Sequence, residues 1–314
     1  MNILISGSLA YDTIMDFPGR FGDHILPDQI HILNVCFLVD DISKNYGGCA
    51  GNIAYTMKLF GANPIILSVL GKDGREYFDY LDKHGILTKY IIQHESRLTS
   101  HASIMTDKDD NQITAYYNGA SDHAGDVGVQ DVLEKYQLGM IVPTLRSAMI
   151  KHARELVQKK IPFVFDPGQQ LPGFSGKELE ELLPLCSFYI VNDYEMRLTE
   201  KITGHTQEEL SKIIKTLIIT RGAKGSQIFT NDEEGMIEVH AVKPRQIVDP
   251  TGAGDAYRAG FFWAYATGKD LKTCAQSASV SAAYAIEQYG TQNHHFSLEE
   301  FYERYQKTYK ENFS

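Results

Sequence analysis

The chain has 314 residues, 43% of them hydrophobic and 22% charged, a balance typical of a soluble globular protein that is long enough to bury a sizeable core. Its 30 Lys and Arg side chains against 40 Asp and Glu give a formal charge of −10 at pH 7. This acidic balance argues against nucleic acid as the main partner, because binding to a phosphate backbone requires a basic surface, but it leaves room for a small anionic ligand that needs only a local positive field.

Short apolar runs alternate with helical patterns along most of the chain. In chain order, the buried strands that the pattern predicts are residues 2–6, 64–70, 140–142, 163–165, 188–191 and 217–220. The predicted helices are residues 52–60, 77–84, 148–159, 255–267, 271–287 and 296–309. Because strands that alternate with helices form parallel sheets covered on both faces, we expect an α/β fold with a mainly parallel central sheet flanked by helices.

Two segments interrupt this alternation. Residues 25–43 mix apolar and polar side chains without a helical period, and residues 99–117 alternate like antiparallel strands. We therefore expect one domain, residues 1–314, in which insertions at about residues 11–46 and 97–120 pair into a small β-sheet lid.

Nothing in the sequence predicts export or insertion into a membrane. The longest apolar run, residues 261–266, is far shorter than the roughly 20 residues of a membrane-spanning helix. The first strand is not preceded by the basic segment of a signal peptide. The cysteines show no CxxC spacing; they are Cys36, Cys49, Cys186 and Cys274. We therefore expect a cytoplasmic protein with reduced thiols and no membrane partner.

The segment Val248-Asp-Pro-Thr-Gly-Ala-Gly-Asp255 carries the strongest chemical signal. Small residues turn the chain here, and Asp255 stands where the predicted helix starts. Unobstructed backbone N–H groups and the positive end of the helix dipole form a site for an anion. A carboxylate beside such a site suits a general base that accepts a hydroxyl proton while the amides hold a phosphoryl group. The alternative is an Asp that only caps the helix.

Other nucleotide and metal motifs are absent from the sequence. There is no GxxxxGK[ST] segment, and GxGxxG fails because Tyr257 occupies the position of the third glycine. The sequence also lacks HExxH, zinc-type Cys and His spacing, and the GxSxG elbow. A P-loop and a Rossmann dinucleotide site are therefore unsupported.

The Asp249-Pro-Thr-Gly-Ala-Gly-Asp255 segment resembles the C-terminal signature of the ribokinase-like (PfkB-type) kinases of sugars and nucleosides. Their N-terminal signature is similar to Gly47-Gly-Cys-Ala-Gly-Asn52, followed by Leu59-Phe-Gly61 and Val69-Leu-Gly-Lys-Asp-Gly74. Within this family the chain is most similar to bacterial adenosine kinases, over Gly7-Ser8 with Asp12, Phe17-Pro-Gly-Arg-Phe21, Leu26-Pro-Asp28, Phe37-Leu-Val-Asp40, Asn111-Gln112, Asp166-Pro167 with Gln169-Gln170, and Gly290-Thr-Gln292. The resemblance implies a ribokinase-like fold.

The resemblance assigns the ribose of a nucleoside to Asp12, with Ser8, Gly48 and Asn52 nearby. A carboxylate accepts hydrogen bonds from two vicinal hydroxyls, so the residue type suits the role. The alternative for Asp12 is a turn cap, and for Asn52 a residue that only starts a helix. The family often has Ser where this chain has Cys36, whose thiol is a poorer hydrogen-bond partner.

Three further residues are candidates for contact with a base. Gln169 and Gln170 follow a predicted strand, and α/β sheets bind ligands at the carboxyl ends of their strands. Each carries a donor and an acceptor that suit a purine edge, and the ring of Tyr116 suits stacking on a base. The alternatives are solvated loop glutamines and a Tyr that packs in the core or lies on the surface.

The resemblance also assigns residues to ATP and Mg²⁺. Asn192-Asp-Tyr-Glu195 matches the family's Asn-x-x-Glu element, which places Glu195 near Mg²⁺ through water and Asn192 near ATP. The same spacing suits a helix capping box, and both roles are compatible. Thr220, Gly222 and Gly225 are assigned to ATP, with a plain hairpin turn as the alternative.

These assignments predict an adenosine kinase that uses ATP and Mg²⁺. The amides of Gly252, Ala253 and Gly254 hold the phosphoryl group, and Asp255 accepts the proton of the 5′-hydroxyl. A lid hinged at Gly47-Gly48 is expected to close and exclude water, and its exposed edges to pair in a homodimer. The alternatives are a ribokinase or other sugar kinase, a purine-nucleoside kinase of broader specificity, and a nucleoside-binding regulator without catalysis.

Overall fold

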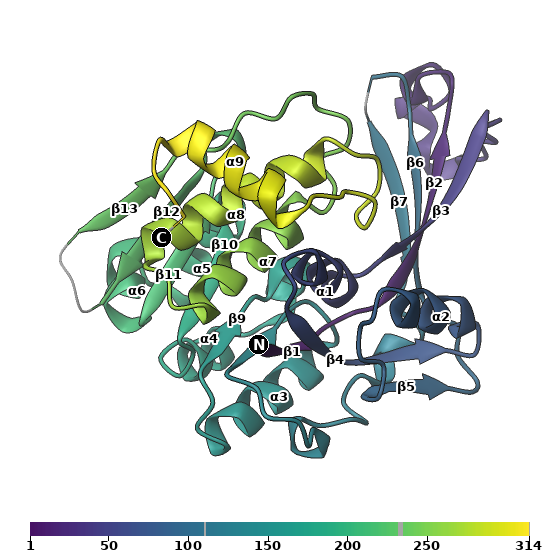
Figure 1. Cartoon of the computed structure of the whole chain (residues 1–314). Helices are drawn as coiled ribbons and strands as arrows, with labels where there is room; N and C mark the ends of the chain where they lie inside the picture. Colours follow the sequence, from purple (N-terminus) through teal and green to yellow (C-terminus); the bar gives the residue numbers. More distant parts are fainter. Residues whose placement is uncertain (110, 232–234, 314) are drawn as a thin grey trace.

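A sheet of nine strands forms the centre of the structure (Figure 1). The structure is a computed structural model that describes residues 1–109, 111–231 and 235–313. The strand order is β13-β12-β11-β10-β9-β8-β1-β4-β5, with bounds β1 Asn2–Ser6, β4 Asn63–Gly71, β5 Ile91–His94, β8 Leu138–Ile141, β9 Phe163–Phe165, β10 Phe188–Asn192, β11 Thr216–Thr220, β12 Ser226–Thr230 and β13 Met236–Val239. The pairs from β5 to β11 are parallel, and β12 and β13 add an antiparallel edge. The predicted parallel sheet is confirmed.

Helices cover both faces of this sheet, because successive side chains of a strand point to opposite sides. Ile3 and Ile5 of β1 belong to one buried cluster, and Leu4 between them belongs to the other. The first face is covered by α1 Cys49–Leu59, α2 Arg75–Lys83, α7 Ala253–Ala266, α8 Leu271–Ile286 and α9 Leu298–Tyr309. The opposite face is covered by α3 Arg146–Gln158, α4 Gly176–Leu182, α5 Asp193–Thr203 and α6 Gln207–Ile213.

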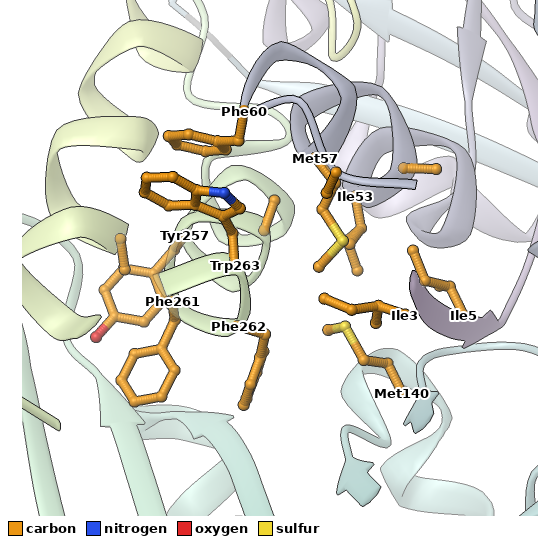
Figure 2. Close-up of a cluster of buried hydrophobic side chains, with 14 of the residues drawn as sticks. Ile3, Ile5, Ile53, Met57, Phe60, Met140, Tyr257, Phe261, Phe262 and Trp263 are labelled. Atoms are coloured by element: carbon orange, nitrogen blue, oxygen red, sulfur yellow. The ribbon is translucent and has the colours of Figure 1, made fainter. Parts of the chain in front are cut away.

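The packing of α1 on α7 is the part of the core that matters for the site. Figure 2 shows Phe60, just after α1, lying over Trp263 of α7, and their ring centroids are 4.3 Å apart. Ile53 and Met57 of α1 pack against Ile3 of β1 in the same cluster. The two helices begin at glycine-rich turns, so this packing brings the two motifs found in the sequence to one place.

A second sheet projects from the side of the main body (Figure 1). Its strand order is β3-β2-β6-β7, with bounds β2 Ala10–Asp16, β3 Asp41–Gly47, β6 Ser100–Thr106 and β7 Gln112–Tyr117. The predicted small β layer is thus present, and we call these four strands the lid sheet. Its strands fall within about the insertions expected at residues 11–46 and 97–120, and within the first insertion they lie at its two ends, residues 10–16 and 41–47, while most of residues 25–40 form turns.

The six predicted helices all exist, and their starts differ from prediction by up to three residues. Helix α1 begins at Cys49 rather than at residue 52, because Gly48 has a left-handed backbone with φ of 85° that lets the helix start directly after it. None of the described helices is long and apolar enough to cross a lipid bilayer.

Candidate active site

The glycine-rich segment forms a turn that leads directly into α7. Gly252 has φ of 79°, a left-handed conformation that a residue with a side chain adopts only with strain. The helix begins at Ala253, two residues earlier than predicted, so Asp255 is its third residue rather than its first. Asp249 stabilises the turn. Its two carboxylate oxygens accept hydrogen bonds from the backbone N–H of Thr251 at 2.8 Å and from that of Gly290 at 3.0 Å.

Backbone amides at this turn differ in whether another protein group engages them. The N–H of Ala253, one of the three predicted to hold a phosphoryl group, donates to the carbonyl of Pro250 at 3.2 Å, so it is engaged within the protein in this structure. In the part of the chain that the structure describes, the N–H groups of Gly252, Gly254 and Asp255 have no protein acceptor. They lie at the positive end of a helix of 14 residues, which favours a negative ligand at that point. We call these three N–H groups the amide nest.

Asp255 lies beside the amide nest and is held by a side chain from the other glycine-rich turn. Its Oδ2 accepts a hydrogen bond of 2.8 Å from Nδ2 of Asn52 in α1. Removal from water raises the pKa of Asp255 to about 6, against the lowering effects of the Arg258 charge and the Asn52 hydrogen bond. A carboxylate with a pKa close to the working pH suits a general base.

A chain of hydrogen bonds continues from Asp255 to the base of the lid sheet. Gln292 Nε2 donates to Asn52 Oδ1 at 2.9 Å and to the Tyr77 hydroxyl at 2.8 Å. Tyr77 in turn donates to the carbonyl of Gly47, the last residue of β3, at 2.7 Å. The ribose contact that the resemblance assigns to Asn52 stays a prediction, and the structure shows that its side chain holds Asp255. In the sequence Gln292 was noted only as part of the family resemblance and Tyr77 was not singled out, and the structure adds both to this network.

Asp12 and Tyr116, both predicted to contact a nucleoside, face the same side of the lid sheet. Asp12 pairs with Asn45 on one side and Ala102 on the other, and Ala102 pairs with Tyr116. Directly paired residues point to the same face of a sheet. The small side chain of Ala102 therefore separates the carboxylate from the aromatic ring, and 52% of Tyr116 remains exposed.

The Asp12 carboxylate lies directly over the backbone of Gly47. A Cβ atom at Gly47 would lie 2.1 Å from Asp12 Oδ2, so a side chain at this position is incompatible with the observed place of the carboxylate. Among the described residues, no side chain or backbone group donates a hydrogen bond to the Asp12 carboxylate. Burial, followed by the charge of Asp255, raises the pKa of Asp12 to about 6. Asp12 is thus an unpartnered carboxylate at the edge of the same site as Asp255.

Ser8 and Gly48 shape the site through the backbone. The Ser8 hydroxyl accepts a hydrogen bond of 3.3 Å from the N–H of Cys49, which fixes the start of α1. Gly48 has no room for a side chain, since a Cβ atom there would lie 2.6 Å from the Ser8 carbonyl oxygen. The two residues predicted near a ribose therefore hold the turn that carries Asn52.

Two cavities meet at the amide nest. The first, of about 390 Å³, is lined by Cys49, Pro143, Asp166, Gly168, Gln169, Asn192, Glu195, Thr220, Gly222, Gly252, Gly254, Asp255 and Arg258, and we call it the polar cavity. Gln169 thus lies beside Asp166 in this cavity, and Gln170 is not among the described residues that line either one. The contact of these two glutamines with a base stays a prediction.

The second cavity, also about 390 Å³, is mostly apolar. Its lining includes Thr220, Gly222 and Gly225, three of the four residues assigned to ATP. It shares Thr220, Gly222 and Gly254 with the polar cavity, which Asn192, the fourth, lines. Val242, Ile247 and residues of α8 such as Ala283 form its apolar walls. An apolar slot that opens into a polar cavity suits a ligand with a flat apolar end and a charged tail.

Glu195 forms the capping box that the sequence offered as an alternative reading. Its Oε2 accepts a hydrogen bond of 2.8 Å from the N–H of Asn192, and its own N–H donates to Asn192 Oδ1 at 2.8 Å. The other carboxylate oxygen is left for a ligand in the polar cavity. No group of three or more His, Cys, Asp or Glu side chains with metal-site geometry occurs in residues 1–109, 111–231 and 235–313. A single carboxylate fits Mg²⁺, which keeps several waters and takes its other ligands from phosphates.

Two more residues of the polar cavity were missed as functional candidates. Arg258 lies three positions after Asp255 on α7, and its guanidinium pairs with the buried carboxylate of Asp166. The sequence signal was available, because residues three apart share a face of a helix. Asp166 was noted only as part of a family resemblance.

Comparison with known proteins gives the family of the chain. The model of the pfkB family of carbohydrate kinases matches residues 22–296. The chain belongs to that family. It is 33% identical over 279 residues to a nucleoside kinase of Methanocaldococcus jannaschii, covering 87% of this chain and 90% of the relative. Residues 22–296 include both glycine-rich turns and Asp255.

The structure is similar to that of a nucleoside kinase of Burkholderia thailandensis in complex with inosine, with a TM-score of 0.90, 34% identity and 99% of each chain covered. A ribokinase of Bacillus subtilis is 26% identical over 302 residues, covering 93% of this chain and 94% of the relative. The predicted ribokinase-like fold is confirmed. This pfkB protein is an ATP-dependent kinase of a nucleoside or sugar.

Proposed function

We propose that this kinase phosphorylates the 5′-hydroxyl of purine nucleosides, with adenosine as the preferred acceptor, and releases AMP and ADP. The observation that carries the proposal is the single row of the lid sheet in which Asp12, Ala102 and Tyr116 face one side. A free carboxylate suits the two ribose hydroxyls, and an aromatic ring one small residue away suits the base. The similarity to nucleoside kinases supports the same conclusion.

The reaction uses the groups around the amide nest. The 5′-oxygen attacks the γ-phosphorus of ATP, the bond from that phosphorus to the β,γ-bridging oxygen breaks, and its electron pair leaves with ADP. Asp255 accepts the proton of the 5′-hydroxyl. The N–H groups of Gly252, Gly254 and Asp255 stabilise the negative charge on the moving phosphoryl group. Asp12 holds the ribose so that the 5′-hydroxyl lies between Asp255 and the phosphoryl group.

We assign the base of ATP to the apolar cavity beside Gly222 and Gly225, and its phosphates to the polar cavity. Mg²⁺, when bound near Glu195, supplies positive charge that neutralises the phosphates. Burial, and then the charge of Asp166, raises the pKa of Glu195, so this carboxylate lies in a negative environment that a cation relieves. Asn192 holds Glu195 in place through the capping box.

The acceptor is tested with adenosine, inosine, guanosine, cytidine and ribose, each with ATP and Mg²⁺. We expect adenosine to give the highest kcat/KM and ribose the lowest. The variant Tyr116→Ala is expected to raise the KM for adenosine by roughly 10-fold or more, because stacking of a base on an aromatic ring contributes about 1–3 kcal/mol. The KM for ribose should not change.

Tyr117→Ala is the matched control, since Tyr117 pairs with His101, the neighbouring position on β6, and therefore faces the opposite side of the lid sheet. Ribose as the best acceptor, with no effect of Tyr116→Ala, would establish a sugar kinase instead. Tight binding of nucleosides without phosphorylation of any acceptor would establish a binding protein without catalysis.

Substitution of Gly47 tests the placement of Asp12. In Gly47→Ala the new methyl group takes the space of the Asp12 carboxylate, so the KM for adenosine should rise roughly 10-fold to 100-fold, the range expected for one lost charge-assisted hydrogen bond. Gly22→Ala is the control in the same insertion, because a Cβ atom there meets nothing within 4 Å. An unchanged KM in Gly47→Ala would show that the carboxylate is not needed where it lies.

The pH dependence should show both carboxylates. Asp12 and Asp255 each have a pKa of about 6 and work in the charged form. Protonation below that pH therefore abolishes their function before it affects the fold of the protein. In the free enzyme both titrate, so kcat/KM should fall with two protons as the pH drops below 6. In the complex the ribose keeps Asp12 charged, so kcat should fall with one proton. Steady-state kinetics as a function of pH measures the fall of kcat/KM and of kcat. Values of kcat/KM and kcat that stay constant down to about pH 5 would contradict these assignments.

The predicted homodimer is a separate proposal. Strands β3 and β7 are the two outer strands of the lid sheet, and outer strands expose backbone groups that pair with another strand. Analytical ultracentrifugation at several concentrations tests it, with a mass of twice 35.3 kDa expected.

A further inference from the structure

The polar cavity contains three carboxylates and one cation. Asp166, Glu195 and Asp255 line it, and Arg258 is the only Lys or Arg among the described residues of the lining. A triphosphate tail adds several negative charges to this environment. A metal ion and the amide nest can offset these negative charges, and among the described side chains of the lining Arg258 is the one cation that can do so.

Arg258 contacts Asp166 through one side of its guanidinium. Nε donates to one oxygen of Asp166, and Nη2 donates to the other at 3.0 Å. Nη1 donates to no protein atom in the part of the chain that the structure describes. This nitrogen lies against Gly254 of the amide nest, since a Cβ atom added to Gly254 would be 2.8 Å from it. Two N–H groups of Nη1 are therefore free next to the place where the nest binds an anion.

A second buried pair in the same protein shows a different geometry. Arg304 donates to Glu287 through both terminal nitrogens, Nη1 at 3.0 Å and Nη2 at 2.6 Å. Its terminal nitrogens are thus used within the protein, as expected of a pair that only holds elements together. The Arg258 side chain is equally buried, at 10% exposed against 9%, but it keeps one terminal nitrogen for another ligand.

We propose that Arg258 binds the γ-phosphoryl group of ATP through Nη1 and that Asp166 is the positioning residue that holds the guanidinium there. The proposal rests on the proposed function only for the use of ATP and is independent of the acceptor. During the reaction the γ-phosphorus forms a bond to the acceptor oxygen and its bond to the β,γ-bridging oxygen breaks. Arg258 takes no covalent part in this exchange. It stabilises the charge on the oxygens of the transferred group, as the planar fork of Arg does for phosphates elsewhere.

The first test is a binding measurement that needs no acceptor. Calorimetry with Mg²⁺ compares ADP with the non-hydrolysable triphosphate AMP-PNP, in the wild-type protein and in Arg258→Gln. We expect the variant to bind AMP-PNP roughly 10-fold to 100-fold more weakly, because hydrogen bonds to charged groups are lost, while its affinity for ADP changes little. Equal weakening of both nucleotides, or of neither, would overturn the proposal.

The second test separates phosphoryl binding from a structural role of the pair. Arg258→Gln alone leaves Asp166 buried and unpaired, so it should lose stability; the double variant Asp166→Asn/Arg258→Gln replaces both charges and should recover it, as urea unfolding measures. The proposal expects kcat of the double variant to stay roughly 10²–10³-fold below wild type, the usual cost of removing one donor to a transition-state charge. A double variant that recovers stability and kcat together would show a purely structural pair.

Arg304→Gln is the matched control. It breaks a pair of equal burial that lies outside the described lining of both cavities, so it should lower stability without changing the ratio of the two nucleotide affinities. If the wild-type protein phosphorylates a sugar rather than a nucleoside, the proposed function fails and the binding ratio still tests Arg258.

Discussion

Replacement of Asp255 with Asn is expected to lower kcat by roughly 10²–10⁴-fold, the range that a positioned general base contributes. Asn keeps the shape of the side chain and an oxygen that accepts the hydrogen bond from Asn52, so the turn and the amide nest should be preserved. What is lost is the negative oxygen that takes the proton of the 5′-hydroxyl. The dissociation constants for adenosine and for ADP should therefore change little.

Steady-state kinetics and calorimetry on the same preparation separate these effects. A variant with near-normal kcat would remove Asp255 from the reaction. A variant that loses kcat and ligand affinity together, with a lower free energy of unfolding, would indicate that Asn disturbs the turn. In that case Asp255→Glu, which keeps a carboxylate on a longer side chain, would test the general base.

Removal of the Asp12 carboxylate is expected to act on binding instead. Two charge-assisted hydrogen bonds to the ribose are lost in Asp12→Ala, and each contributes about 1.5–3 kcal/mol, so the KM for adenosine should rise roughly 10²–10⁴-fold. At saturating adenosine, kcat should fall much less. Asp16→Ala is the control, because Asp16 lies four residues further along β2, on the same face but towards the far end of the lid sheet.

Deoxynucleosides identify the hydroxyls that Asp12 contacts. The wild-type enzyme should prefer adenosine to 2′-deoxyadenosine and 3′-deoxyadenosine, and Asp12→Ala should lose most of that preference, because the partner of the missing hydroxyl is already gone. A preference that survives the substitution would place the ribose hydroxyls on other residues.

The central fold was predictable because its signals are local. Apolar runs such as residues 2–6 and 163–165 became β1 and β9 with the predicted bounds, and the long helices of the last third became α7 and α8. The lid sheet was predictable as a layer, and the alternation of residues 99–117 predicted the antiparallel pair β6 and β7, but the strands β2 and β3 were not delimited. Residues 10–16 follow β1 after only three residues, and their partly buried alternation looked like a turn rather than a strand.

The candidate site was predictable in part for the same reason. The turn at residues 252–254 and the place of Asp255 beside it follow from small residues before a helix, a local feature. The contact from Asn52 to Asp255 spans 203 positions, and the one from Gln292 to Asn52 spans 240. Such contacts depend on how α1 packs on α7 and where the segment after α8 lies, and no periodic pattern records that.

Two predictions about the direction of a group gain no support from the structure, for a shared physical reason. Ala253 was expected to offer its amide, and Gln169 with Gln170 were expected to face a purine. In each case the residue type was suitable but the direction of a group was decided by tertiary structure: Pro250 takes the amide of Ala253, and Gln169 lies in the cavity of Asp166. A sequence gives the chemistry that a residue offers more readily than the direction in which it points.

The most direct test of the account is the position at which phosphate appears on a nucleoside. The enzyme is mixed with ATP, Mg²⁺ and either adenosine or 5′-deoxyadenosine, and the products are identified by ³¹P NMR. We predict ADP and a monophosphate on the 5′-carbon with adenosine, and no transfer to 5′-deoxyadenosine even though it binds. Phosphate on the 2′- or 3′-oxygen, or equal release of inorganic phosphate with both compounds, would contradict a site in which Asp12 holds the ribose and Asp255 activates its 5′-hydroxyl.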